Sequence, residues 1–216
     1  MTAVERAANA RAGRDLVNLS NVDMVAADPV LTQLLDWVQG FLTRPHVDLG
    51  RSGPVCPFTV PSLNRELLWA SVVAGDHLSA DDIASATESM VDEFLRLESS
   101  GSADSLYKAA MVVFPDVTDF DLIDQVQRAG KSRAVENGMM LGQFYPGCAE
   151  PGLWNADFRP LDCPLPMIAL RHMVPSDFPF LVNDPEWLSS YLKRFAPSVP
   201  AQVRSTMVDR LLTQRD

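Results

Sequence analysis

The feature that most constrains this fold is a set of four short apolar runs, each of strand length. They are LLWASVVAG (67–75), AAMVVFP (109–115), MMLGQFY (139–145) and LPMIALRHM (165–173). Apolar runs of this length, bounded by Gly, Pro or polar residues, are typical of strands buried in a sheet. The runs therefore predict a mixed or antiparallel sheet, although a helix remains the alternative for residues 67–75.

Segments with helical periodicity separate these runs and predict the layers that cover the sheet. One begins at Asp28-Pro29, where Asp is a favoured N-cap and Pro a favoured first helical residue. Another begins at Ser79 with acidic residues in its first turn. A third follows Phe120 and should end by Gly138, since glycine commonly terminates helices.

Two more helices are expected in the C-terminal third, at residues 184–195 and 200–212. Residues 1–27 carry small and charged residues with weak periodicity, so we expect a flexible N-terminal arm. The chain contains no repeat or long linker that would divide it. The predicted fold class is α+β, with a single domain over residues 28–216.

Charge and hydropathy exclude several kinds of partner. The formal net charge of −10 repels nucleic-acid phosphates and anionic lipid. No apolar run approaches the roughly 20 residues of a membrane span, and the N-terminal segment lacks the apolar stretch of a secretory signal. We expect a cytoplasmic protein with a small-molecule substrate, with no nucleic-acid or membrane partner, and with a homodimer as one expected assembly.

Polar and aromatic residues that suit a functional site are concentrated in two proline-rich segments, residues 44–58 and 143–180. Neither segment contains a phosphate-binding glycine loop, a nucleophile elbow, an HExxH motif or a paired CxxC. The three cysteines are widely spaced, which is unlike a disulfide framework and predicts buried thiols or one reactive thiol. Ordered loops of this kind often carry binding residues.

The first segment, RPHVDLGRSGPVCPF, combines Arg44, His46, Arg51 and Cys56 within one compact loop. This combination suits an anion or a metal ion, and Cys56 has the chemistry of a thiolate ligand. The alternative is structural: the arginines pair with nearby acids, His46 caps a backbone carbonyl, and Cys56 is an inert buried thiol.

In the second segment, His172 lies where a predicted strand leaves the core. Strand alternation places Ile168, Leu170 and His172 on one face, and Ala169 and Arg171 on the other. A histidine on an apolar face is more often a hydrogen-bonded core residue than a ligand. It is nevertheless placed to be an axial ligand if a haem lies against that face.

The two segments resemble those of a bacterial family catalogued only as a domain of unknown function, through GPVCPF (53–58) and FRPL...RHMVPSD (158–177). This family is distantly similar to the YqcI/YcgG type of proteins, which share a Cys-Pro-Phe element. Some of those proteins are haem-dependent enzymes that oxidise nitrogen on amino-acid substrates. The resemblance covers about residues 44–195.

The resemblance implies a haem-dependent oxidative enzyme, an oxygenase or oxidase of a natural-product pathway. His172 would bind the iron, and a set of cofactor-binding residues would surround the haem: Arg44, His46, Arg51, Cys56, Arg159 and Arg171. The chain departs from its relatives at Tyr145 and Trp154, which stand where histidine is common. These departures put the metal site in doubt.

Two other functions remain open. A cofactor-free cyclase or isomerase would use acid and base groups in an aromatic pocket, with Tyr145 and Asp177 as the catalytic residues and Asp157 or His172 in support. A non-catalytic binding or accessory protein would dock on a partner chain through its N-terminal arm and its C-terminal helix.

Overall fold

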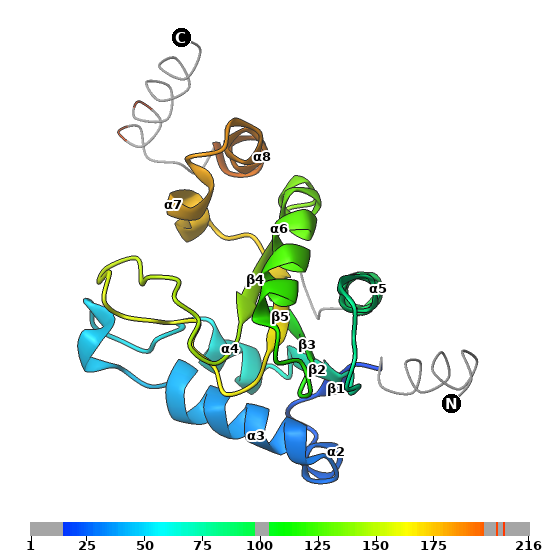
Figure 1. Ribbon diagram of the computed structural model, residues 1–216. Helices are drawn as coiled ribbons and strands as arrows, with labels where there is room; N and C mark the ends of the chain where they lie inside the picture. The colour runs from blue at the N-terminus through cyan, green and yellow to red at the C-terminus, as the bar shows by residue number, and fades with distance from the viewer. Residues whose placement is uncertain (1–14, 98–103, 197–201, 203–204, 206–216) are drawn as a thin grey trace.

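A computed structural model describes residues 15–97, 104–196, 202 and 205 of the chain (Figure 1). Its sheet has the strand order β1-β2-β3-β5-β4, in which β2 and β3 are parallel and the other neighbours are antiparallel. The strands are β1 (Val17–Asn18), β2 (Leu68–Val72), β3 (Ala109–Val113), β4 (Met139–Phe144) and β5 (Met167–His172). A mixed sheet covered by helices confirms the predicted α+β class.

Seven α-helices surround this sheet within the described residues. They are α2 (Val22–Ala26), α3 (Pro29–Trp37), α4 (Thr59–Asn64), α5 (Ala80–Arg96), α6 (Phe120–Glu136), α7 (Phe178–Leu181) and α8 (Pro185–Phe195). A π-helical turn, Val38–Leu42, continues α3, and 3-10 turns occupy Val47–Leu49, Ser105–Tyr107 and Pro175–Asp177.

The caps expected from the sequence begin the helices where they were predicted. A side-chain oxygen of Asp28 accepts from the backbone N–H groups of Val30 and Leu31, and Pro29 is the first residue of α3. Ser79 and Asp82 form a capping box at the start of α5. The helix predicted at 200–212 lies largely outside the described residues.

The described part of the predicted arm, residues 15–27, contains regular secondary structure. This part contains β1, which pairs with β2, and α2, whose N-cap is Asn21. Leu19 and Val25 are buried against the sheet, which holds the segment in place. The sequence did not reveal these elements, because β1 has two residues and α2 has five, which is too short for a clear periodic pattern.

Helices cover the two faces of the sheet unequally. On one face α5 and α6 bury a core that includes Ile168 and Leu170 of β5 and Leu141 of β4 (Figure 1). On the other face α2 and α3 cover β1, β2 and part of β3, in a core that includes Leu34 and Met111. The segments that face the remaining part of this second face are mainly loops.

The chain after β5 forms α7 and α8, which lie towards the top of Figure 1, and α8 packs against α6. Here α7 and α8 bury Leu181, Leu188 and Tyr191 against Val135 of α6 and Met140 of β4. Across the described part of the chain, no helix has the length and apolar character to cross a membrane.

Candidate functional site

Small residues at the centre of the second sheet face leave a hollow there. Ala169 of β5 lies between Met111 of β3 and Gly142 of β4 in the strand register. Ala169, Gly142 and the nearby Ala109 are half-buried, although each lies in a strand of the sheet. Larger side chains at these positions would fill the hollow, so these three small residues form its floor.

A cavity of about 1350 Å³ lies over this floor. Its walls come from parts of the chain that are far apart in sequence: the turn after α3, the loop before α4, the loop between β4 and β5, and the segment from Pro175 to Phe195. Pockets for small molecules commonly occupy about 300–1,000 Å³, so the cavity has room for a ligand of substantial size.

The two loops that form much of the wall are fastened to each other. The side-chain amide of Asn155 donates to the carbonyl oxygen of Asp48 at 2.8 Å. Leu49, Val55 and Phe158 form a small apolar cluster between the loops. These contacts bring the two motif segments, residues 53–58 and 158–177, to the same cavity.

Gly50 allows the closest approach between these loops. It has a φ of +77°, and an added Cβ would lie 2.9 Å from the carbonyl oxygen of Trp154. We expect Gly50→Ala to lower the free energy of unfolding by about 2 kcal/mol, because it adds backbone strain and displaces Trp154. Chemical denaturation would measure this change.

Gly147 provides a matched control for that substitution. Its φ is +75°, but an added Cβ would contact nothing within 4 Å. Gly147→Ala should therefore show the backbone strain alone, about 1 kcal/mol. An equal loss of stability in the two variants would contradict close packing between the loops.

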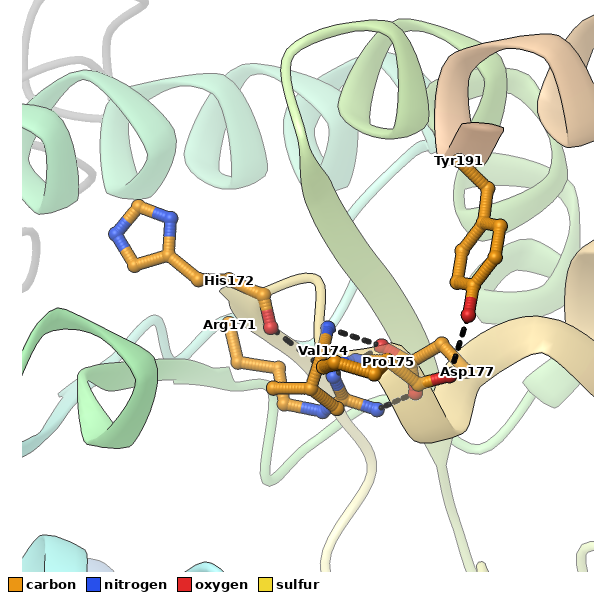
Figure 2. Close-up of polar contacts among 6 residues, drawn as sticks. All are labelled: Arg171, His172, Val174, Pro175, Asp177 and Tyr191. Carbon is orange, nitrogen blue, oxygen red and sulfur yellow. Dashed lines mark hydrogen bonds and ion pairs between the residues drawn. The ribbon is translucent and has the colours of Figure 1, made fainter. Parts of the chain in front are cut away.

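An ion pair between Arg171 and Asp177 forms one wall of the cavity (Figure 2). Both oxygens of the carboxylate accept from the guanidinium at 2.7 Å, and one of them also accepts from the backbone N–H of Val174. Asp177 is 2% exposed, whereas the Arg171 side chain is 31% exposed. The guanidinium is therefore the member of the pair that a ligand can reach.

Cys56 lines the same cavity as Arg171. Its backbone N–H donates to the carbonyl oxygen of Leu42, which fixes the Cys-Pro-Phe element to the end of the π-helical turn. The half-buried Cys56 is a free thiol, as are the buried Cys148 and Cys163. Among the described residues, Cys56 is the thiol that a ligand in the cavity can meet.

The cavity extends past the edge strand β4 towards α6 and α8. The ammonium group of Lys131 lies 4.3 Å from the ring centroid of Trp187, and both residues line the cavity. Burial lowers the pKa of Lys131, while Glu150 and Asp184 partly oppose the shift. Burial raises the pKa of Tyr191, whose hydroxyl donates to the carbonyl oxygen of Pro175 at 2.6 Å (Figure 2).

The His172 ring points away from the Arg171–Asp177 pair (Figure 2), and His172 does not line the cavity. It lies on the sheet face covered by α5, where its ring centroid is 5.1 Å from that of Phe94. Burial, together with the charges of Lys108 and Arg194, lowers the pKa of His172 to about 4. The imidazole is therefore neutral near pH 7 and is half-buried against Phe94, on the face that strand alternation predicted.

The structure also places Arg44, His46 and Arg159 outside the cavity wall. Arg44 is exposed. Nδ1 of His46 accepts from the backbone N–H of Asp48, and the His46 ring packs 4.9 Å from Phe158, so His46 caps a turn through an amide and not through a carbonyl. Arg159 donates to the carbonyl oxygens of Ala156 and Phe158, which braces its own loop.

Arg51 does line the cavity, and its guanidinium donates to the carbonyl oxygens of Ser52 and Val55. The structure thus brings together four of the predicted site residues: Arg51, Cys56, Arg171 and Asp177. Within the part of the chain that is described, no group of three or more His, Cys, Asp or Glu side chains could hold a metal ion.

Tyr145 lies outside the cavity wall, beside α6. Its hydroxyl donates to a carboxylate oxygen of Asp124 at 3.0 Å, and its ring stacks on Phe120. Burial raises the pKa of Tyr145, and hydrogen bonds to Cys148 and Asp124 raise it further. The two predicted catalytic residues, Tyr145 and Asp177, are therefore not assembled in one pocket.

The floor residues Gly142 and Ala169 were not singled out from the sequence, although a signal was present. Ala169 is a small residue between Met167 and Arg171 on one strand face. Gly142 interrupts the apolar run that forms β4. Small residues within predicted strands can mark places where a ligand approaches the backbone, but the register that makes them neighbours is not visible in the sequence.

A family model matches most of the chain. The family model described as "Domain of unknown function (DUF6875)" matches residues 31–206, which include both wall loops and the whole floor. No curated protein matches the chain. No solved structure matches it either.

Proposed function

The chain belongs to the DUF6875 family, and from the site built by its two motif segments we propose that it is an enzyme acting on a small molecule held in the cavity. One observation carries this proposal. The two motif segments are about a hundred residues apart, yet Cys56 of one and the Arg171–Asp177 pair of the other line the same cavity. A free thiol in the same cavity as a buried, charged hydrogen-bonding group is typical of a functional site.

The reaction class that we propose is haem-dependent oxidation in a bacterial biosynthetic pathway. The resemblance to YqcI/YcgG-type proteins supports it, and so does a cavity with a largely apolar wall and enough volume for a macrocycle. Nitrogen of an amino-acid-like substrate is the proposed site of oxidation. The free thiols support a reducing, cytoplasmic location, while the homodimer stays a prediction.

The cavity wall fits haem with a different iron ligand from the predicted His172. Haem iron accepts histidine, cysteine, methionine or tyrosine as a protein ligand. Among the described residues, no histidine lines the cavity, and the lining methionines and Tyr191 are buried, whereas the Cys56 thiol lines the cavity and is only half-buried. Cys56 would therefore hold the iron, and Arg51 would pair with a propionate. When bound, haem would supply the activation of oxygen or peroxide that oxidation requires.

The residues around Cys56 would prepare the site for this chemistry. The Arg171 guanidinium, oriented by the buried carboxylate of Asp177, would donate a hydrogen bond to the thiolate or to a polar group of the substrate. The apolar floor would exclude water from the ligand. Held within fastened loops, Cys56 would have little freedom to move away.

The absorption spectrum of protein expressed with a haem precursor tests this proposal. We expect a Soret band at one haem per chain, retained in His172→Gln and lost in Cys56→Ser. The carbon monoxide adduct of the reduced protein should absorb at the longer wavelength that is characteristic of a thiolate ligand. Cys163→Ser is the matched control, because Cys163 is a buried thiol outside the cavity wall.

Other outcomes would change the proposal in defined ways. A band lost in His172→Gln but kept in Cys56→Ser would overturn the thiolate assignment. A colourless protein in every preparation would overturn haem chemistry, and the cofactor-free enzyme would then be the next candidate. Because Tyr145 lies outside the cavity wall, that enzyme would need acid and base groups other than the predicted pair.

A further inference from the structure

The floor of the cavity has a defined shape and a defined polar end. It spans strands β3, β5 and β4, and it runs along β5 from Met167 to Arg171. Strand spacing and rise make it roughly 10 Å by 14 Å. Ala169 and Gly142 occupy its centre and project almost nothing above the backbone. Met111, Met167 and Phe144 line the cavity around this centre, so a flat ligand can lie over Ala169 and Gly142 between these larger side chains.

Arg171 stands at one end of this floor and retains unused hydrogen-bond donors. A guanidinium has five N–H donors. Within the described residues, three of them are used: two by the Asp177 carboxylate and one by the carbonyl oxygen of His172. Two donors remain on a side chain that is partly exposed and lines the cavity. They suit a carboxylate or a similar anionic oxygen.

The charges of the cavity wall favour an anion as well. The chain as a whole has 28 acidic and 18 basic residues. Among the described residues, however, the wall carries more cationic than acidic side chains: Arg51, Arg128, Lys131 and Arg171 against Asp124, Glu150 and Asp177. The local excess of positive charge in an acidic protein would concentrate a negatively charged ligand at this site.

We infer that the cavity binds a planar, largely apolar molecule with an anionic group, which lies flat on the Gly142–Ala169 floor and directs that group to the free donors of Arg171. This inference deepens the proposed function, since it names the ligand class of the same site. It depends on neither iron nor Cys56. A porphyrin and an aromatic carboxylate share this chemistry, and the experiment below separates them.

Two fluorescent probes test the inference. Anilinonaphthalenesulfonate has a planar aromatic body with an anionic group, and phenylnaphthylamine has the same body without the charge. We expect the full chain to bind one sulfonate probe per molecule, about tenfold or more tightly than the neutral probe, because a charge-assisted hydrogen bond is lost with the sulfonate.

Variants at the floor locate the binding. In Ala169→Leu the longer side chain would occupy the floor, so the affinity for both probes should fall about tenfold or more. Gly142→Leu is a second substitution that would fill the floor. An added Cβ there has only the Phe144 ring within 4 Å, at 3.8 Å, so the side chain can be accommodated. Ala129→Leu is the control, as it adds the same side chain to an exposed position on α6 outside the cavity wall.

Removal of the charged pair tests the polar end. The double variant Arg171→Gln/Asp177→Asn avoids an unpaired buried charge. It should bind the sulfonate probe as weakly as the neutral one, while binding of the neutral probe stays unchanged. Equal affinity of the wild type for the two probes would overturn the anionic end, and unchanged binding in both floor variants would overturn the floor.

Titration with haem and with iron-free protoporphyrin distinguishes a porphyrin ligand from an aromatic acid. It also tests this inference separately from the proposed haem enzyme. Displacement of the sulfonate probe by protoporphyrin, in a manner independent of Cys56, would identify a porphyrin as the ligand. Probe binding that the porphyrin does not displace would identify an aromatic acid. If the floor variants weaken probe binding but no preparation shows a Soret band, only the haem proposal is overturned. If a Soret band is present and is lost in Cys56→Ser, but the floor variants bind the probes normally, only this inference is overturned.

Discussion

The variant Arg171→Met is expected to lose about 3 to 5 kcal/mol of unfolding free energy. The reason is the carboxylate of Asp177, which is almost fully buried and, among the described residues, would keep only its hydrogen bond from the Val174 N–H. An unpaired buried charge costs far more than the pair contributes when both members are present. Urea denaturation at neutral pH would measure the loss.

Two companion variants show whether the unpaired charge is the cause. Asp177→Asn leaves the partly exposed guanidinium within reach of water, so it should cost less, about 1 to 3 kcal/mol. Arg171→Met/Asp177→Asn should recover much of the stability lost in Arg171→Met. A double variant as unstable as the sum of the two single variants would contradict this account, because it would mean that the two side chains act independently.

Acidification is expected to destabilise the protein through His172. Its pKa is lowered from about 6.5 to about 4 in the folded state, so below pH 6.5 the unfolded chain binds a proton that the folded chain does not. The stabilising contribution is complete above pH 6.5 and is lost as the pH falls towards 4. A shift of this size corresponds to about 2 to 3 kcal/mol for a partly buried group.

His172→Gln separates this effect from the protonation of carboxylates, which also lowers stability in acid. The neutral variant should lose about 2 to 3 kcal/mol less than the wild type between pH 7 and pH 4. Lys108 and Arg194 supply the positive charges that oppose protonation, and Nζ of Lys108 is held by the carbonyl oxygens of Phe94 and Leu97. Parallel pH profiles for the two proteins would contradict the placement of His172 in this cationic, apolar setting.

Elements with strong local signals could be predicted from the sequence. The run LPMIALRHM became β5, and the capped segments at Asp28 and Ser79 became α3 and α5. Short elements could not be predicted in this way. The helix α4 lies in a proline-containing stretch that favoured a loop, and α7 is a single turn. Both depend on tertiary packing more than on local propensity.

Two features of the candidate site could not be predicted from the sequence. Alternation along β5 correctly separated His172 from Arg171, but it could not say which face helices cover and which face carries the cavity. That difference depends on where α5, α6 and the two loops pack. Sequence distance likewise concealed that Cys56 and Arg171 line one cavity, because this arrangement follows from contacts between loops.

The measurement that tests the central claim most directly is a haem titration of the wild type, Cys56→Ser and Ala169→Leu, followed at the Soret band. A cavity that holds the cofactor over its floor and binds iron through Cys56 predicts saturation at one haem per chain in the wild type and an affinity at least about tenfold lower in both variants. Equal haem affinity in all three proteins, or no saturable binding to the wild type, would contradict the claim that this cavity is a haem enzyme's active site.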